Sequence, residues 1–371
     1  MNLDELRLKI DTLDKEILSD FSERMDVCRQ VALYKQENGL PVFQKGREHQ
    51  ILNKVTSSAP DGLETASSAL FSCIMDISKC LQEQELLKNH EFLKPQDFKP
   101  ETAKKIACQG VSGSNSETAT RKLFPTQEII FYHEFEDVFK AVENGDVDFG
   151  ILPFQNSTAG SVTQTYDLMR KYNFFINRLI RTEITHCLAI REDTDISQVK
   201  KVYSHPQALS QCSEYISRLG LEAIPFENTA TAGKFVAESK EPISAICSDS
   251  CAEIYGLKVH AKGISNSQPN YTRFICISKN FTASPKSDIV SVTITLPNTK
   301  GSLYRFLTKF FVSGLNLSRI ESRPLGKGSF NVSFYLDFEG NALDERVSAL
   351  LTSLDNEVED FRFFGNYSEM F

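Results

Sequence analysis

The chain has 371 residues, which is too long for one ordinary hydrophobic core, so we expect two or three domains. Its net charge of −8 argues against general binding to nucleic acid or to an anionic membrane surface. No apolar run approaches the roughly 20 residues of a membrane span, and the acidic, helical start does not resemble a signal peptide. The nine cysteines are scattered and the six histidines do not cluster beside a cysteine pair, so we expect reduced thiols, a cytoplasmic protein and no zinc site.

The first 90 residues predict helices only, over 3–37, 42–57 and 63–88. Apolar residues recur every three or four positions along the first helix, as in a helix buried along one side: Leu6, Ile10, Leu13, Ile17 and Phe21. This helix would be about 50 Å long, at 1.5 Å per residue. Two shorter helices cannot cover it, so we expect a partner chain.

The same stripe continues through Arg24 and Lys35, which therefore face inward. Because an unpaired buried cation is costly, an anion between these two side chains would be favourable. The alternative is an exposed, frayed helix end where both reach water. The three helices also offer Arg7, Arg47, Glu48, Ser78 and Gln82. Without a nucleophile–base pair or a metal cluster, this set fits a reaction that needs a held conformation and charge stabilisation.

The pattern changes after a linker over residues 91–103. Residues 104–282 predict a domain in which strands alternate with helices, with strands near 105–109, 149–152, 202–203 and 243–246, and this alternation indicates α/β layers. Polar loops follow these strands, and free N–H groups at helix N-termini suit carboxylates or phosphates. The alternative for each loop is ordinary N-capping by Ser and Asp.

The segment 288–371 predicts a third, smaller domain. Strands are expected over 289–296, 315–321, 330–337 and 358–364, with helices over 302–312 and 343–353. This βαββαβ order is that of an α+β ferredoxin-like domain, a fold that by itself says nothing of function.

The helical segment resembles the all-helical chorismate mutase family in the spacing of Leu6-Arg7, Arg24, Lys35, Pro41-Val42, Arg47-Glu48, Ser78 and Gln82. The resemblance implies an intertwined dimer in which Arg7 enters the partner's site. It further implies that Arg7, Arg24 and Arg47 hold the two carboxylates of chorismate. Lys35 and Gln82 would bond the ether oxygen, and Glu48 the ring hydroxyl. The family often has Asp where this chain has Gln44.

The middle domain resembles prephenate dehydratase over residues 104–278. The matching stretches are 110–116, 153–157, 204–207 with 211–212, 228–230, and Asn270-Tyr271-Thr272-Arg273-Phe274. The resemblance implies loss of CO2 and hydroxide from prephenate, with Thr272 near the leaving hydroxyl, where a proton donor is needed. Propensity alone would explain Thr272 as a strand residue.

The same resemblance assigns further residues of the dehydratase site. Asn156, Ser204 and Gln211 fall on the family's site positions, Ser114 and Ser116 would cradle a carboxylate, and Gln155 and Arg273 are expected to bind substrate. Gln155 replaces the family's usual Glu, and Asn115 stands where a Tyr is usual. His205 precedes a proline at a strand end, which is more often a structural position.

Two motifs in the last domain look like the phenylalanine-binding motifs of ACT domains, and they contribute Gly301, Ser302 and Leu303, and Glu321, Ser322, Arg323 and Pro324. The resemblance implies that phenylalanine binds between two paired ACT domains and lowers activity. A polar hairpin connection is the alternative for the second motif.

These features together predict a bifunctional enzyme of phenylalanine biosynthesis, a homodimer or homotetramer, with no cofactor and no metal. A non-catalytic amino-acid sensor is the alternative, because a two-lobed α/β domain can serve ligand binding alone. A mutase fused to prephenate dehydrogenase is rejected, because the loop 110–113 does not supply the required G-x-G-x-x-G motif.

Overall fold

The computed structural model describes residues 2–39, 45–87, 90–324, 332–358 and 360–371. The chain divides into two compact units. One comprises Met1–Lys94 with Asp288–Phe363, and the other comprises Pro95–Ser287 with Phe364–Phe371. Each unit is described separately below.

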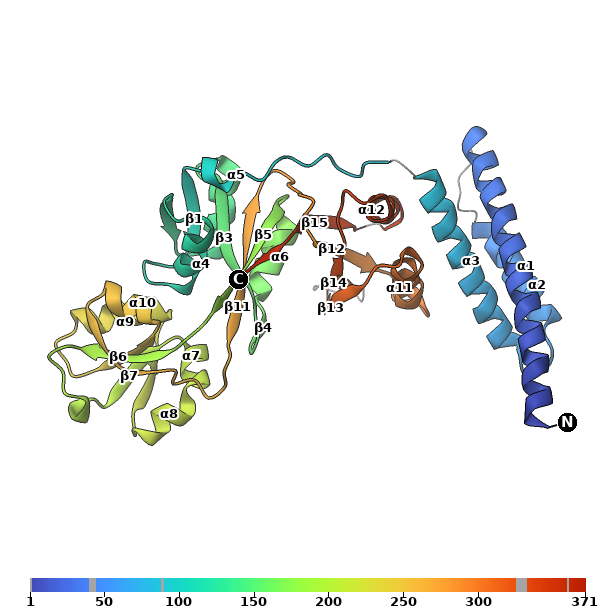
Figure 1. The fold of residues 1–371 in the computed structure, drawn as a ribbon. Coiled ribbons are helices and arrows are strands. Elements are labelled where there is room, and N and C mark those ends of the chain that lie inside the picture. The colour runs from blue at the N-terminus through green and yellow to red at the C-terminus, as the bar shows by residue number, and fades with distance from the viewer. Residues whose placement is uncertain (1, 40–44, 88–89, 325–331, 359) are drawn as a thin grey trace. The chain divides into compact units, whose positions relative to one another are not determined.

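The first unit begins with the three predicted helices, α1 (Leu3–Glu37), α2 (Lys45–Ser58) and α3 (Glu64–Leu86) (Figure 1). A capping box opens α1, since the Asn2 side chain accepts from the Glu5 N–H at 2.9 Å and the Glu5 carboxylate accepts from the Asn2 N–H. Helix α3 packs against both α1 and α2.

The predicted burial of the α1 stripe is wrong for this chain by itself. Leu6, Ile10, Leu13 and Ile17 are 43–64% exposed, whereas the buried residues of α1 are Met25 and Ala32. The reason is that the described parts of α2 and α3 do not cover the first turns of α1, as the lengths of the helices indicated.

The rest of this unit forms a four-stranded sheet with two helices, and the last strand of the sheet continues past Phe363 into the second unit. Its elements are β12 (Ile289–Leu296), α11 (Ser302–Ser313), β13 (Leu317–Pro324), β14 (Val332–Glu339), α12 (Glu345–Glu357) and β15 (Arg362–Tyr367). The strand order β13-β14-β12-β15 confirms the predicted βαββαβ arrangement. Ser322 to Pro324 follow the predicted strand 315–321 but lie within β13, because this strand begins and ends later than predicted.

In the second unit, the larger sheet has the order β16-β5-β11-β3-β1-β2, with β4 added beside β3. Its strands are β1 (Lys105–Gln109), β2 (Glu128–Tyr132), β3 (Phe149–Asn156), β4 (Gly160–Ser161), β5 (Phe175–Glu183), β11 (Tyr271–Ser278) and β16 (Glu369–Met370). Helix α4 (Asn115–Leu123) packs on the face that carries Ile151 and Phe274. The opposite face receives α5 (Phe135–Asn144), where Val138 and Val142 contact Gly150, and α6 (Thr163–Lys171).

The second sheet of this unit has the order β10-β6-β9-β7-β8. Its strands are β6 (Cys187–Arg191), β7 (Lys201–Ser204), β8 (Glu222–Pro225), β9 (Ser244–Cys247) and β10 (Leu257–Lys262). The accompanying helices are α7 (Pro206–Gln211), α8 (Ser213–Arg218), α9 (Thr229–Glu238) and α10 (Asp249–Ile254). Two sheets with flanking helices confirm the predicted α/β domain with two lobes (Figure 1).

The strand directions of the larger sheet bring distant residues to one edge. Strands β1 and β3 are parallel and β11 is antiparallel to β3. The carboxyl ends of β1 and β3 therefore meet the beginning of β11, which places the start of α4, Asn156 and Thr272 at the same edge.

Two further sequence expectations bear on the chain's environment. All nine cysteines are free thiols, and burial raises the pKa of the Cys212 thiol to about 12, which keeps it protonated at neutral pH. In the described part of the chain, no helix combines the length and the apolar composition that crossing a membrane requires.

Candidate active sites

A hydrogen-bonded pair of side chains joins β3 to β11 at the shared edge. Asn156 Nδ2 donates to Thr272 Oγ1 at 2.9 Å and to Asn270 Oδ1 at 2.8 Å. On its other side, Asn156 Oδ1 accepts from the Thr158 hydroxyl at 2.7 Å and from the Ala159 N–H at 2.9 Å. The Asn156 amide is thus held from both sides. Because Thr272 receives this bond through its oxygen, its own hydroxyl hydrogen is available for another acceptor.

The second lobe reaches the same cluster through Gln211, the last residue of α7. Gln211 Nε2 donates to Thr158 Oγ1 at 3.0 Å, and Gln211 Oε1 accepts from Asn270 Nδ2 at 3.3 Å. The same oxygen lies 3.1 Å from His186 Nε2. In this amide orientation Gln211 Oε1 can only accept, so His186 carries its proton on Nε2. Burial lowers the pKa of His186, which favours the neutral imidazole.

A buried hydroxyl lies directly across from Thr272 on β5. Thr182 is the register partner of Thr272 and is 3% exposed. Within the described structure its Oγ1 makes no hydrogen bond. Nearly all buried polar groups have a partner, so such a hydroxyl beside Asn156 and Thr272 indicates a place for a ligand or water. Asn156, Thr272 and Thr182 form a polar row across three adjacent strands.

Sequence reasoning gave no site role to four members of this cluster. Asn270 lies within the recognised stretch 270–274 and Thr158 directly follows the stretch 153–157, so these motifs could have indicated both. Thr182 lies near the end of β5 and His186 lies just beyond this strand, and no motif was recognised at either position. Thr182 joins the cluster through strand register and His186 through its contact with Gln211, and the local sequence reveals neither.

The predicted carboxylate cradle is largely a set of helix caps. Ser114 is the N-cap of α4 and its Oγ accepts from the Glu117 N–H at 3.2 Å. The Glu117 carboxylate in turn accepts from the Gly113 N–H at 2.7 Å and from the Ser112 hydroxyl at 3.2 Å. Ser116 is buried in the first turn of α4. Ser114 is therefore an ordinary N-cap, which was the alternative for this loop. The Gly113 N–H already donates to the Glu117 carboxylate.

Two residues at the end of β7, Ser204 within the strand and His205 directly after it, also have structural partners. The Ser204 side chain is completely buried and its hydroxyl donates to the Ile246 carbonyl at 2.6 Å, which ties β7 to β9. His205 Nδ1 accepts from the Gln207 N–H at 3.2 Å and caps α7. His205 thus occupies the structural position that its place before a proline indicated.

Gln155 and Arg273 lie on the face of the sheet opposite Thr272. They are register partners on β3 and β11, and successive side chains of a strand point to opposite faces. Arg273 donates to Glu369 from Nε at 2.8 Å and from Nη2 at 3.1 Å, and its Nη1 is 3.3 Å from Gln155 Oε1. The structure therefore does not bring these two residues into the cluster around Asn156.

The helical segment holds part of the predicted mutase set in buried positions. On α3, Gln82 Nε2 donates to Ser78 Oγ at 2.9 Å, and both residues are buried. On α2, the Glu48 carboxylate lies 3.1 Å from Lys79 Nζ, which also pairs with Asp76 at 2.9 Å. This ion-pair network joins α2 to α3 beside the Ser78–Gln82 pair.

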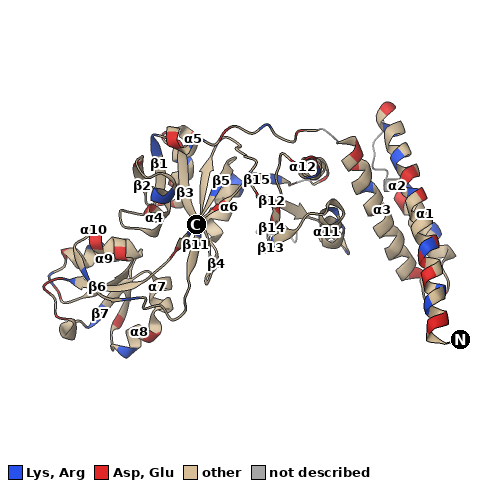
Figure 2. Cartoon of the chain, in the orientation of Figure 1, with Lys and Arg blue, Asp and Glu red and all other residues tan. Residues whose placement is uncertain are grey.

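The cations of the predicted mutase set differ in exposure. Arg24 and Lys35 are half-buried on α1, where charges of both signs alternate (Figure 2). Arg7 is exposed and lies 3.5 Å from Asp4, and Arg47 is exposed on α2. Gln44 lies outside the described residues. The sequence left two alternatives open for Arg24 and Lys35, an inward-facing position around an anion and an exposed helix end. Their half-buried positions lie between these two alternatives.

The two motifs of the four-stranded domain lie on a helix start and on a strand. Gly301 has φ +79°, a conformation that favours glycine, and it precedes Ser302 and Leu303 in the first turn of α11. On β13, Glu321 Oε1 accepts from Arg323 Nη2 at 2.9 Å, and the Arg323 guanidinium lies 5.9 Å from the Tyr335 ring centre. Ser322 and Pro324 complete the second motif on β13.

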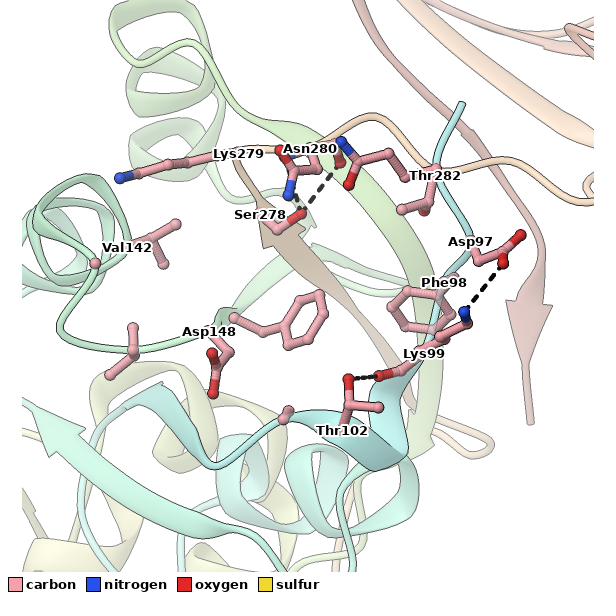
Figure 3. Close-up of a pocket in the computed structure, with 15 residues that line it drawn as sticks. Asp97, Phe98, Lys99, Thr102, Val142, Asp148, Ser278, Lys279, Asn280 and Thr282 are labelled. Carbon is pink, nitrogen blue, oxygen red and sulfur yellow. Dashed lines mark hydrogen bonds and ion pairs between the residues drawn. The ribbon is translucent and has the colours of Figure 1, made fainter. Parts of the chain in front are cut away.

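A cavity of about 550 Å3 lies at the other edge of the larger sheet (Figure 3). Phe149 at the beginning of β3 and Ser278 at the end of β11 line it, whereas Asn156 and Thr272 occupy the opposite ends of these strands. Lys99 on its wall is paired with Asp97 at 3.1 Å. None of the lining residues belongs to the predicted sites, so this cavity is separate from the Asn156–Thr272 cluster.

Family models match both enzyme segments. A model described as "Chorismate mutase type II" matches residues 6–83, and one described as "Prephenate dehydratase" matches residues 106–282. The bifunctional chorismate mutase/prephenate dehydratase of Enterobacter agglomerans is 31% identical over 98% of this chain and 95% of its own length. Arogenate dehydratase/prephenate dehydratase 2 of Arabidopsis thaliana is 34% identical over 71% of this chain and 72% of its own length.

A solved structure agrees with these matches. The prephenate dehydratase of Arthrobacter aurescens, determined in complex with L-Phe, is 28% identical, with a TM-score of 0.66 over 71% of this chain and 89% of that one. The two family models, the near full-length relative and this structure lead to one conclusion. The chain belongs to the family of bifunctional chorismate mutase/prephenate dehydratases and carries both enzyme domains.

Proposed function

We propose that this chain rearranges chorismate to prephenate in its helical segment and converts prephenate to phenylpyruvate in its two-sheet domain. The observation that supports the second step most directly is the Asn156–Thr272 pair, which holds the Thr272 hydroxyl in place. Gln211 connects the second lobe to the same hydrogen-bonded cluster. The reactions form a sequence, because the product of the first is the substrate of the second.

In the proposed dehydratase reaction, the bond from the ring to its carboxylate breaks and CO2 leaves. The electron pair of that bond enters the ring, hydroxide departs from the opposite carbon, and the ring becomes aromatic. Hydroxide is a poor leaving group, so a proton must reach it and water leaves. Thr272 is proposed to hydrogen-bond this oxygen, since its hydroxyl hydrogen is not used by Asn156. The Thr182 hydroxyl would contact the same part of the substrate.

The other dehydratase residues are proposed to orient this reacting pair. Asn156 holds Thr272, and Gln211 holds Thr158 and Asn270 across the lobes. Ser204 and Ser114 support the site through the backbone of β7 and α4, and Ser116 is buried in the first turn of α4. Gln155 and Arg273 would act from the back of the sheet rather than on substrate.

In the proposed mutase reaction, no covalent bond to the protein is needed. Arg24 and Arg47, with Arg7 from a partner chain, would hold the two carboxylates of chorismate. Lys35 and Gln82 would stabilise the negative charge that grows on the ether oxygen as its bond to carbon breaks, and the buried Ser78 orients the Gln82 amide. Glu48 would accept from the ring hydroxyl, and Gln44 would replace the carboxylate that the family often has.

We further propose that the chain is an even-numbered homo-oligomer in the cytoplasm. The exposed apolar face of Leu6, Ile10, Leu13 and Ile17 supports a partner helix on α1. The segment 288–371 is proposed to be an ACT domain that binds phenylalanine and lowers activity. Its βαββαβ topology, the turn at Gly301 and the Glu321–Arg323 pair on β13 support this assignment.

The regulatory proposal is tested by titrating phenylalanine into the whole protein in a calorimeter. We expect saturable binding and a lowered dehydratase rate, and we expect both to be lost in Gly301→Val, where a β-branched side chain cannot readily adopt φ +79°. Binding that persists in Gly301→Val, or no binding in the wild type, would contradict the assignment. The Gly145→Val variant, at φ +79° after α5, is the matched control.

The dehydratase proposal is tested with prephenate supplied directly, while the ultraviolet absorbance of phenylpyruvate is followed. We expect turnover by the wild type and by the exposed control Thr126→Ala, and loss of turnover in Thr272→Ala. Arogenate is assayed in parallel, because the plant relative is named for both substrates. Turnover of arogenate alone would correct the substrate, and turnover of neither would contradict the proposal.

A further inference from the structure

The segment 368–371 adds an edge strand to the larger sheet of the second unit, beside β5. Strand β16 pairs in parallel with β5, with Glu369 beside Leu179 and Met370 beside Ile180. The Leu179 N–H donates to the Ser368 carbonyl at 3.1 Å. Met370 packs into the core on the α4 face, so Glu369 points to the opposite face, where Arg273 lies.

Glu369 bridges two arginines that face each other across β5 and β11. Arg181 and Arg273 are register partners, and like charges directly opposite in a sheet repel. The Glu369 carboxylate accepts twice from Arg273, at 2.8 and 3.1 Å, and lies 3.6 Å from Arg181 Nε. Its side chain is only 12% exposed, so this attraction is screened less than that of a surface pair. Phe371 stacks on the Arg181 guanidinium at 3.9 Å.

The approach of this segment to β5 depends on one glycine. Gly365, in β15, has φ +144°, and a Cβ there would overlap the Ile176 carbonyl oxygen. Only glycine therefore allows the backbone to pass this close to β5 before Ser368 and Glu369.

The two arginines that Glu369 holds, which we call the Glu369 clamp, are each next in sequence to a threonine of the Asn156–Thr272 cluster. Thr272 precedes Arg273 on β11 and Thr182 follows Arg181 on β5, and the two threonines are themselves register partners. Removing the bridging carboxylate would leave two opposed cations one residue away from this threonine pair. A small shift of reacting groups is costly, since about 1 Å of misplacement can cost about 100-fold in rate.

We propose that Glu369 is a positioning residue for the dehydratase site. Its carboxylate holds Arg181 and Arg273 together on one face of the sheet, and this fixes Thr182 and Thr272 on the other face. The inference rests on the proposed dehydratase role of Thr272. It also gives Arg273 and Gln155 a role that needs no contact with substrate. Arg273 binds Glu369, and Gln155 in turn accepts from Arg273.

The test compares Glu369→Gln with Asp193→Asn in the full chain. The control removes a similar two-pronged arginine–carboxylate pair, Arg191 with Asp193, from the other sheet of the same unit. We expect Glu369→Gln to lower kcat for prephenate about tenfold with little change in KM, because alignment rather than binding is lost. We expect Glu369→Asp to recover part of this loss and Asp193→Asn to have no effect.

Two further measurements separate positioning from general destabilisation. In Arg273→Met, the additional change Glu369→Gln should cost little more, since the clamp is already broken. Gly365→Ala, which displaces the segment and keeps every charge, should reproduce the loss of kcat. Mutase activity, measured on the same samples, should not change.

Wild-type kcat in a folded Glu369→Gln protein would overturn the inference, as would equal losses of mutase and dehydratase activity. Additive effects of Arg273→Met and Glu369→Gln would also overturn it. If the wild type itself fails to turn over prephenate, the dehydratase proposal fails instead, so the two failures are distinguishable.

Discussion

Asn156 Nδ2 lies 2.9 Å from Thr272 Oγ1, and this bond joins the last residue of β3 to the second residue of β11. More than 110 residues separate the two in sequence, and both are buried. The bond uses the threonine oxygen as acceptor, which leaves the hydroxyl hydrogen available for another acceptor. The edge of the sheet thus presents one oriented hydroxyl, supported by the cross-lobe contacts of Gln211.

The role of this hydroxyl predicts different effects for two replacements of Thr272. Thr272→Val keeps the shape and removes the hydrogen-bond donor, so the dehydratase kcat should fall at least about 100-fold, the lower end for loss of a proton-transfer group. Thr272→Ser keeps the donor and should retain most of the rate. Steady-state kinetics with prephenate measure both. Equal rates for the valine and serine variants would contradict a role for the hydroxyl.

The unpaired Thr182 hydroxyl gives a second prediction, in which stability and binding change in opposite directions. Thr182→Val removes a buried polar group that has no partner in the described structure, so the free energy of unfolding should rise by about 1 kcal/mol. If the hydroxyl contacts substrate, KM for prephenate should rise several-fold. Urea unfolding and kinetics provide the two values. A less stable variant with unchanged KM would show that the hydroxyl has only a structural role.

His186 predicts a loss of stability in mild acid. Burial lowers the pKa of His186 in the folded state, so below the ordinary histidine pKa of about 6.5 the unfolded chain binds more protons than the folded one. The stabilisation present above this pH is lost as the pH falls from about 6.5 toward the lowered value. Urea unfolding at pH 7.5 and 5.5 should show a smaller difference in His186→Gln than in the wild type.

The exposed His260 provides the matched control for this measurement. His260→Gln should leave the difference between the two pH values as it is in the wild type. An identical pH dependence in His186→Gln and the wild type would mean that other groups cause the acid sensitivity.

For the mutase step, Arg24→Ala should abolish turnover of chorismate while the circular dichroism spectrum stays unchanged. The reason is that Arg24, which is half-buried, is proposed to hold a carboxylate of chorismate through two parallel hydrogen bonds, and alanine can form neither. Arg29→Ala removes an exposed arginine of the same helix, paired only locally with Asp26, and should keep the activity. Near-normal turnover by a folded Arg24→Ala protein would remove Arg24 from the site.

Local signals in the sequence predicted some elements closely and missed others, because periodicity and capping act over only a few residues. The strand expected over 149–152 extends to Asn156, and the strand expected over 358–364 is observed at Arg362–Tyr367. Helix α1 was predicted over 3–37 and is observed at Leu3–Glu37, and β1 and β12 also have their predicted bounds. Strand β13 was placed two residues early, since its polar second half lacks an apolar signal. The motif residues Asn156, Gln211 and Thr272 were found by resemblance, and the structure brings them together.

The remaining contacts depend on strand register, which no local pattern encodes. Glu369 lies far in sequence from Arg273 and reaches it only because β16 joins the sheet beside β5. Thr182 gains its position opposite Thr272 in the same way. Alternation along β11 also decides that Arg273 faces away from Thr272, although the two are neighbours in one recognised motif.

The most direct test of the account is to incubate the wild-type protein with chorismate alone and follow phenylpyruvate. The account predicts that phenylpyruvate forms without added prephenate. Disappearance of chorismate without phenylpyruvate, or no change in chorismate at all, would contradict the claim that one chain performs both reactions.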